Sequence, residues 1–436
     1  MSFPRYPKYK ASGGEWMGEV PEGWGISPLK IVASHNDDTL DEKTQPDTEI
    51  LYVDISGVDA LDGIKTKEPM SFSAAPSRAR RRVKNGDTIV STVRTYLRAI
   101  ARVRNPEENL IVSTGFAVVR PRADLSPDYV GYVLSAAYFI EQVIARSTGV
   151  GYPAINASDL VRIPVAIPPL PEQTAIAEFL DRETGKIDEL VAEQRRLIEL
   201  LKEKRQAVIS HAVTKGLNPH APMKPSGIEW LGDVPGHWEV MRVGTLFRDV
   251  AEPGIDDLPI LSVSIHDGVS DKEFAEEEMD RKVTRSDDRT KYNRVLPNDL
   301  VYNMMRAWQG GFGTVTVEGM VSPAYIVARP RRLLETAFIE NLLRTPPAIE
   351  QMRRHSRGVT DFRLRLYWDE FKNVRVALPP QAEAKAVLAH ISVMDESFRN
   401  MSAVSERAID LLQERRTALI SAAVTGKIDV RGLALA

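Results

Sequence analysis

The chain has 436 residues, a formal net charge of −3, 43% hydrophobic residues and no cysteine. This length predicts two or more domains, because a single core rarely grows beyond about 250–300 residues. The absence of cysteine excludes disulfides, a thiolate nucleophile and cysteine-based zinc sites, and it is typical of the reducing cytosol. No run of about 18 apolar residues is present, and the polar start MSFPRYPKYKASGGEW lacks the apolar core of a secretion signal. We therefore expect a cytoplasmic protein without a membrane span.

The first 170 residues predict a mixed α/β globular domain. Short alternating stretches such as ILYVDIS (50–56) indicate strands, and a helix is expected from about Pro127, with Ser126 as its N-cap. The apolar face of this helix would contain Val130, Val133, Leu134, Ala137, Ile140, Val143 and Ile144. Pro168-Pro169 ends the domain, and residues 171–217 are rich in Glu, Lys, Arg, Leu and Ala, which predicts a long helix.

Basic residues are clustered at two places along the chain. Nine basic residues and one acid lie between Arg78 and Arg104, and seven basic residues and three acids lie between Arg353 and Arg375. Clustered cations are typical of a surface that binds phosphate groups. For either cluster alone, a solvated basic surface without a ligand is the alternative.

The whole organisation occurs a second time after residue 217. The segments KASGGEWMGEVPEGW (10–24), VKNGDTIVSTVR (83–94) and LLKEKRQAVISHAVT (200–214) match KPSGIEWLGDVPGHW (224–238), VLPNDLVYNMMR (295–306) and LLQERRTALISAAVT (411–425). The offset stays between 209 and 214 residues, so one long unit is present twice. We expect globular domains at 1–170 and 218–381 and helical spacer regions at 171–217 and 382–436.

The two repeats share a pair of tryptophans and differ at the helix near Pro127. The Trp16/Trp24 and Trp230/Trp238 pairs flank Val-Pro in both units and are predicted to anchor the two cores. In the second unit, two shorter helices broken by Pro346-Pro347 are expected in place of the helix near Pro127.

Both helical regions have the alternating three- and four-residue spacing of a coiled-coil seam. The expected seam residues are Ile187, Leu190, Leu197, Leu201 and Val208 in the first region and Phe398, Met401, Leu412 and Leu419 in the second. Polar residues also fall at matched seam positions, namely Gln194 with Ser405 and Lys204 with Arg415. Pairing of the two helices around a pseudo-two-fold axis would give an antiparallel coiled coil. The alternative is that each helix packs only on its own domain.

The order domain–helix–domain–helix resembles the specificity subunits of Type I restriction–modification systems. The resemblance is carried by PPLPEQTAIAEFLDRETGKIDELV (168–191), by VTKGL (213–217) and by the two openings EWMGEVPEGW and EWLGDVPGHW. It implies two target-recognition domains, each reading one half of a split double-stranded DNA sequence, held apart by the paired helices. The second unit departs from the pattern at PPQAEAKAVLAHI (379–391), where loss of Pro-Glu-Gln is expected to weaken helix initiation or alter a subunit contact.

The resemblance also implies the partners. Two methyltransferase subunits would dock on the helices, and restriction/motor subunits would join them. S-adenosylmethionine, ATP and Mg²⁺ would be bound by those partner subunits, and this chain would have no cofactor and no catalytic residue.

The motifs that are missing favour the same interpretation. The sequence has no Asn-Pro-Pro-aromatic motif for a flipped adenine and no Gly-x4-Gly-Lys-Ser/Thr loop for ATP, and its seven histidines have no metal-ligand spacing. Two alternatives stay open: a coiled-coil scaffold without specific DNA binding, and a self-contained DNA-modifying enzyme.

Candidate base-reading residues lie on loops beside predicted strands, because a rigid scaffold can aim them there. Arginine pairs with guanine, and Asn or Gln with adenine, through two parallel hydrogen bonds. One loop in each unit follows the strands DTIVS (87–91) and DLVYN (299–303), and a second loop follows later. The predicted DNA-binding residues are Arg94, Arg98, Thr148, Tyr152, Arg306, Trp308, Gln309, Arg357, Arg363 and Arg365.

The helix length suggests a spacing between the two half-sites. Helices from about Lys186 to Val213 and from about Ser397 to Val424 would each have about 28 residues, or ~42 Å at ~1.5 Å per residue. That length favours a non-specific gap of roughly 5–7 base pairs between the half-sites.

Overall fold

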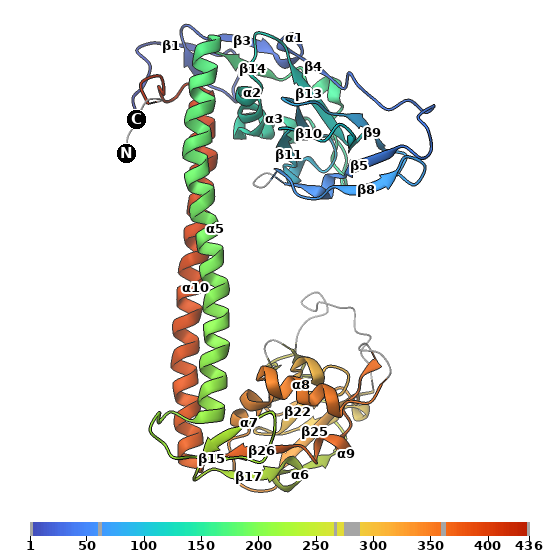
Figure 1. Cartoon of the computed structure of the whole chain (residues 1–436), viewed down its shortest axis with the longest axis vertical. Coiled ribbons are helices and arrows are strands. Elements are labelled where there is room, and N and C mark those ends of the chain that lie inside the picture. The colour runs from blue at the N-terminus through green and yellow to red at the C-terminus, as the bar shows by residue number, and fades with distance from the viewer. Residues whose placement is uncertain (1–2, 60–62, 266–267, 274–287, 359–362, 434–436) are drawn as a thin grey trace. The chain divides into compact units, whose positions relative to one another are not determined.

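A computed structural model describes residues 3–59, 63–265, 268–273, 288–358 and 363–433 (Figure 1). It divides into two compact units, of which the first contains residues 1–196 and 405–436 and the second contains residues 197–404. Each unit combines one globular region with parts of both long helices, α5 (Leu170–Lys215) and α10 (Gln381–Val424). The structure thus groups helix and globular segments together, where the sequence suggested four segments in series.

Two four-stranded sheets form the globular part of the first unit. One has the antiparallel order β11 (Ile100–Arg102), β10 (Thr88–Ser91), β13 (Phe116–Pro121), β4 (Ala33–His35). The other has the order β8 (Glu68–Ser71), β5 (Glu49–Val53), β12 (Leu110–Ser113), β9 (Ala79–Arg82), and β12 runs parallel to β5. The short pairs are β1 (Tyr9–Ala11) with β2 (Glu19–Pro21), β3 (Gly25–Pro28) with β14 (Pro164–Ile167), and β6 (Val58–Asp59) with β7 (Gly63–Ile64). The strand predicted at 50–56 is β5.

The second unit repeats the first of these sheets. Its order is β23 (Phe312–Thr314), β22 (Leu300–Asn303), β25 (Tyr325–Pro330), β18 (Phe247–Val250), again antiparallel throughout. The short pairs are β15 (Met223–Pro225) with β16 (Asp233–Pro235), β17 (Glu239–Arg242) with β26 (Arg375–Leu378), β19 (Val263–Ser264) with β20 (Gly268–Val269), and β21 (Asn293–Val295) with β24 (Gly319–Val321). The internal repeat of the sequence is therefore a repeat of this sheet, whereas the mixed sheet of the first unit has no four-stranded counterpart among the described residues of the second.

The helix predicted from Pro127 is two helices, α2 (Pro127–Ser135) and α3 (Ala137–Arg146). Ala136 between them is extended, and the first N–H of α3, on Ala137, donates to the Ser421 hydroxyl of α10 at 3.1 Å. That contact satisfies an amide that continuation of the helix would otherwise have bonded. Most of the predicted apolar face is buried, but Ile144 is exposed.

The second unit has the predicted pair of helices, α7 (Thr336–Leu343) and α8 (Pro346–His355), so the two units agree here more closely than the sequence suggested. The remaining short helices are α1 (Leu29–Val32), α4 (Ala157–Leu160), α6 (Val243–Leu246) and α9 (Trp368–Phe371).

Each core contains the beginning of one long helix and the end of the other. In the first unit, Phe179 and Leu180 of α5 and Ile420 and Val424 of α10 belong to one buried cluster with Trp24. In the second unit, Val387 and Ile391 of α10 and Ile209 and Val213 of α5 share a cluster with Trp238. A long helix therefore packs on its own domain at its start and on the domain of the other repeat at its end.

The long helices begin earlier than predicted, and some of their buried residues are not the predicted ones. α5 has 46 residues and α10 has 44, rather than about 28, because their first turns belong to the globular cores. Leu190, Leu197 and Met401 are exposed, so the predicted seam is wrong at these three positions. The neighbours Val191 and Ile198 are buried instead. The predicted residues Ile187, Leu201, Phe398 and Leu419 are buried, and Val208 and Leu412 are half-buried.

This shift has a simple origin. Positions three and four residues after Ile187 are both apolar, and only the contact with the partner helix decides which one turns inward. Within the first unit Arg416 of α10 donates to Asp188 of α5 at 2.9 Å, and within the second unit Arg205 of α5 donates to Asp395 of α10 at 2.8 Å. The cations beside the interface are thus Arg205 and Arg416, not Lys204 and Arg415.

One tryptophan in each unit is buried beside the start of a long helix. Trp24 and Trp238 are buried, and each indole N–H donates to a glutamate at 3.1 Å, Glu172 in α5 and Glu383 in α10. Glu383 is therefore the counterpart of Glu172, so the glutamate of Pro-Glu-Gln is retained, and α10 starts at the position equivalent to the start of α5. Trp16 is 48% exposed, which contradicts its predicted role as a core anchor. Trp230 is half-buried against its core.

Candidate nucleic-acid interface

In the first unit, the two loops predicted to read bases meet. The first loop joins β10 to β11 and contains Arg94 and Arg98, and the second follows α3 and contains Thr148 and Tyr152. The Arg94 guanidinium lies over the Tyr152 ring, 4.6 Å from its centroid, and the Arg94 amide donates to the carbonyl of Pro153 at 2.8 Å. Arg94 and Tyr152 are therefore in one place, on a surface where Tyr152 is 64% exposed, and Thr148 is tied to the same loop by backbone bonds to Ala154. Arg98 lies apart from them and lines a hollow with Ile140 and Arg407.

The backbone of this region is unusual for arginine. Arg94 and Arg98 flank a single 3-10 turn and both are left-handed, with φ of 51° and 52°. Non-glycine residues rarely adopt this conformation, and the cost is of order 1–3 kcal/mol each. A glycine would fit at both ends of the turn without strain. The presence of arginine there, at a conformational cost, therefore indicates that the guanidinium groups have a role.

The second unit builds the same frame with other residues at its tip. Arg357 and Arg365 exchange backbone hydrogen bonds at 2.9 Å, as Thr148 and Ala154 do in the first unit. The Leu366 amide donates to Met304, just as the Ile155 amide donates to Thr92, each at 2.9 Å. The two loops that are predicted to read bases are thus joined by equivalent bonds in each unit. Residues 359–362 of the second tip lie outside the described residues.

Arginines line a hollow of about 760 Å³ at the tip of the second unit. Arg357, Arg363 and Arg365 surround it, together with Met305 and the acids Asp369 and Glu370. Arg357 forms an ion pair with Glu370, which leaves Arg365 as the exposed tip arginine that has no acidic partner among the described residues.

The other predicted residues of the second unit lie on the loop after β22. Arg306 donates to the Gln309 side chain at 3.4 Å, and the Trp308 indole donates to the Met305 carbonyl at 3.0 Å. The indole N–H is therefore already used within the loop, whereas Gln309 is exposed.

The basic cluster between Arg78 and Arg104 is not a uniform cationic surface. Five of its nine basic residues pair with acids: Arg78 with Asp54, Arg82 and Lys84 with Asp38, Arg102 with Asp181, and Arg104 with Asp128. Arg94 and Arg98 have no acidic partner within the described part of the chain. The cationic surface is thus smaller than the sequence cluster suggested.

A buried ion pair supports each loop from below. Asp87 at the start of β10 binds Arg120 at 2.8 and 2.7 Å, and Asp299 at the start of β22 binds Arg329 at 3.0 and 2.9 Å. Hydrogen bonds to the aspartate raise the pKa of Arg120 and of Arg329, because they stabilise the protonated guanidinium. Both aspartates also accept a backbone N–H from the turn before the strand, at 2.7 and 2.9 Å.

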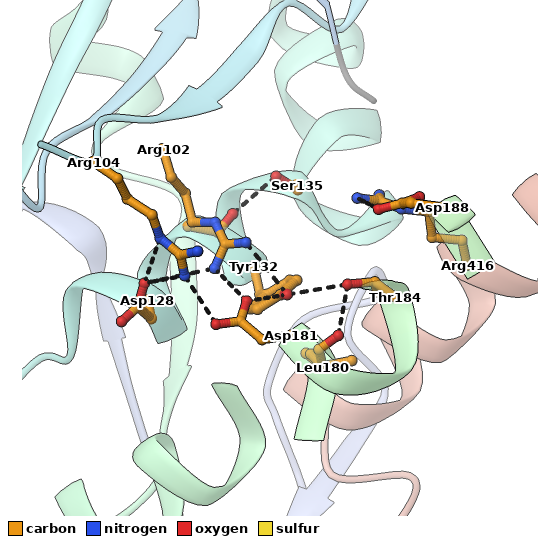
Figure 2. Close-up of polar contacts among 11 residues, drawn as sticks. Arg102, Arg104, Asp128, Tyr132, Ser135, Leu180, Asp181, Thr184, Asp188 and Arg416 are labelled. Carbon is orange, nitrogen blue, oxygen red and sulfur yellow. Dashed lines mark hydrogen bonds and ion pairs between the residues drawn. The ribbon is translucent and has the colours of Figure 1, made fainter. Parts of the chain in front are cut away.

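A second polar network, present in the first unit, connects β11 to α5 (Figure 2). Arg102 donates to Asp181 at 3.0 Å, Arg104 donates to Asp181 at 2.9 Å and to Asp128 at 2.6 Å, and the Tyr132 hydroxyl donates to Asp181 at 2.6 Å. Partial burial raises the pKa of Asp181, but the hydrogen bond from Tyr132 and the two guanidinium groups lower it further, so the net pKa lies below its usual value.

The network depends on a close approach that sequence reasoning did not find. The Arg102 side chain lies against the backbone of Gly131 in α2, where an added Cβ would come within 2.1 Å of it. Its guanidinium also stacks on the Tyr132 ring at 4.2 Å. Since β11 leaves the loop that contains Arg94 and Arg98, this network holds that loop in place on α5.

The described residues contain no cluster of three or more potential metal-binding His, Asp or Glu side chains. Within the same residues, no helix has the length and hydrophobicity needed to cross a bilayer.

Residues 76–200 match the model of the Type I restriction modification DNA specificity domain. The chain is 25% identical over 248 residues to the putative type I restriction enzyme MjaX specificity subunit of Methanocaldococcus jannaschii, which covers 52% of this chain and 53% of that protein. It is 23% identical over 308 residues to the MjaVIII specificity subunit of the same organism, covering 66% and 68%. The match thus spans about half the length of the first relative.

The fold also matches a solved structure. A chain from a structural study of complex assembly and conformational transition of the type I R-M system superimposes with a TM-score of 0.66 at 20% identity, covering 93% of this chain and 98% of that one. Together with the sequence relatives, this match confirms the resemblance that the repeated motifs predicted.

Proposed function

We propose that this chain, a member of the specificity subunits of Type I restriction–modification systems, binds double-stranded DNA sequence-specifically and directs methyltransferase and restriction subunits to a bipartite target. One observation carries the proposal. Two units that share the topology of one four-stranded sheet each present an exposed loop pair, with an arginine that has no acidic partner among the described residues, held on an equivalent hydrogen-bonded frame. A duplicated frame with different tips is suited to reading two different half-sites.

The chemistry of the tips fits base recognition in the major groove. Arginine donates two parallel hydrogen bonds to guanine O6 and N7, and Gln309 is able to do the same with adenine. Arg94, stacked on Tyr152, has a fixed direction, so less side-chain entropy is lost when it meets a base. The ion-paired cations of the two basic clusters contribute less, because their charge is already compensated within the protein.

The helices support a finer proposal. We infer that α5 and α10 pair as an antiparallel coiled coil, since an ion pair joins them within each unit and Ile391, Phe398 and Ser405 of α10 are buried seven positions apart. We further infer that the helices dock two methyltransferase subunits, and that restriction/motor subunits join this complex in the cytoplasm. S-adenosylmethionine, ATP and Mg²⁺ would be bound by those subunits, and this chain would be non-catalytic.

The proposal is tested by mapping methylated adenines in cells that carry single variants. Arg94→Ala should relax one position of one half-site, and Arg306→Ala should relax one position of the other. A lost bidentate contact costs roughly 1–3 kcal/mol, which is about 5- to 150-fold in discrimination at that position. Lys8→Ala, an exposed cation away from the loops, serves as the charge control.

Other outcomes point to other functions. Equal weakening on all sequences would assign these arginines to phosphate contacts. No salt-dependent DNA binding by the purified complex would favour the scaffold alternative, and methylation by the isolated chain would favour a self-contained enzyme.

A further inference from the structure

A hollow of about 270 Å³ lies in the second unit beside the start of α10. Its walls include Leu333, Leu334 and Glu335, which precede α7, and Pro379 and Ala384, which surround the beginning of α10. Charged side chains, including Arg332 and Glu239, lie at its margin.

The equivalent place in the first unit is filled by the chain itself. Gln173 in the first turn of α5 is completely buried, and its side chain makes three hydrogen bonds. Its amide nitrogen donates to the carbonyls of Asp124 and Pro168 at 3.1 and 2.9 Å, and its oxygen accepts from the Ser126 amide at 2.8 Å. This is a complete binding site for a primary carboxamide, which has one acceptor and two N–H donors.

The repeat relates the two places residue by residue. Asp124, Leu125 and Ser126 lie between β13 and α2, and Leu333, Leu334 and Glu335 lie between the equivalent β25 and α7. Pro168 precedes α5 as Pro379 precedes α10, and Gln173 corresponds to Ala384. All five counterparts of the glutamine site are among the residues that line the hollow. The hollow is therefore the glutamine site without its glutamine.

The backbone groups that would hold an amide are present in the second unit. They are the carbonyls of Leu333 and Pro379 and the amide N–H of Glu335, and within the described residues none of them forms a hydrogen bond that takes the place of the Gln173 contacts. Glu335 is the N-cap residue of α7, and its side chain accepts a hydrogen bond from the Gln381 side-chain amide at 3.3 Å; both residues line the hollow.

We propose that this hollow binds a primary carboxamide from outside the chain, either the side chain of a glutamine or asparagine on a partner protein or a small free amide. A carboxylate is a poor ligand, because it has no N–H to donate to the two carbonyls. An alkyl group would fill the space but leave the three polar groups unpaired. The inference does not depend on DNA binding.

The experiment is a titration of the full chain with propionamide, followed by NMR of labelled leucine methyl groups. We expect saturable shifts at Leu333 and Leu334, and no saturation with propionate or N,N-dimethylpropionamide, which lack the N–H donors. Two variants fill the hollow from within: Ala384→Gln should supply the internal amide, and Ala384→Leu should supply similar bulk without the hydrogen bonds. Both should weaken propionamide binding by more than about tenfold.

Gln173→Ala is the reciprocal variant. It should create a second propionamide site, which would be reported by Leu125. Absence of saturable shifts in the unaltered chain, or equal binding of propionate, would overturn the proposal whatever the variants do. A short glutamine-containing peptide that binds more tightly than propionamide would assign the ligand to a partner protein, and one that binds no better would assign it to a small amide. Equal binding of the matched glutamate peptide would again refute the carboxamide.

Discussion

Two neighbouring residues of α5 are expected to respond oppositely to the same substitution. Val191 is 6% exposed and Leu190 is 45% exposed. The seam predicted from the sequence instead placed Leu190, three residues after Ile187, between the helices. Val191→Ala removes two buried methyl groups, each worth ~0.8 kcal/mol of transfer free energy, and leaves a small cavity, so we expect a loss of about 2 kcal/mol. Leu190→Ala removes a larger but half-exposed side chain and introduces the best helix former, so its effect should stay within about 0.5 kcal/mol.

The assay is thermal unfolding of the full chain, followed by far-ultraviolet circular dichroism. In a unit of this size, a loss of about 2 kcal/mol lowers Tm by roughly 4–8 °C. Ile198→Ala and Leu197→Ala form the same matched pair in the second unit, where the exposed fractions are 9% and 42%. The opposite result would be that Leu190→Ala and Leu197→Ala lower Tm more than Val191→Ala and Ile198→Ala do. That result would show that the leucines, and not their neighbours, are buried between the helices.

Three further predictions concern charge and length. Asp299→Ala should lower the free energy of unfolding by about 1.5–3 kcal/mol, because Arg329 loses its buried partner and keeps only the partly exposed Glu252, whereas Asp159→Ala, which breaks an exposed pair with Arg162, should cost under ~1 kcal/mol in the same urea titration. Asp181→Asn should lower Tm at neutral pH, because the depressed folded-state pKa of Asp181 means that its ionised form stabilises the fold. The difference in Tm from the unaltered chain should shrink as the pH falls through the acid range below the ordinary aspartate pKa of 3.8. A difference in Tm that is independent of pH would exclude the ionised carboxylate as its cause. Insertion of one heptad after Leu201 and one after Leu412 should lengthen each helix by ~10 Å and the gap between methylated half-sites by about three base pairs, and an active complex with an unchanged gap would show that the helices do not set the spacing.

The sequence predicted those features of the fold that are repeated or local. The duplication, a strand beginning near residue 50, two shorter helices in the second unit, and the loops that contain Arg94 and Arg306 all follow from patterns within one stretch of chain. The sequence placed Arg94 and Tyr152 on two separate loops and did not predict that these loops meet, which is seen only in the fold.

The remaining features depend on contacts between segments far apart in the chain. The break at Ala136 is stabilised by Ser421, and the inward turn of Val191 rather than Leu190 is decided by packing on the other helix. The sequence placed Arg102 and Arg104 in a predicted phosphate-binding cluster, because their sequence neighbours are cations. Both arginines instead donate to Asp181, which is more than 70 residues away in the chain. Local periodicity and composition contain no information about such partners.

Comparison of the two repeats separates what the fold requires from what recognition requires. The tryptophan–glutamate bond at each helix start and the arginine–aspartate pair below each loop occur at equivalent positions in both units, and their acceptors are largely buried. The tips are exposed and share almost no chemistry: Gly149, Val150 and Gly151 precede Tyr152 in one unit, and arginines occupy the other. Packing constrained the frame in both copies, whereas the tips were free to diverge. If the two tips read the same bases, that divergence would have no physical reason, so the frame and its tips together favour an asymmetric DNA target.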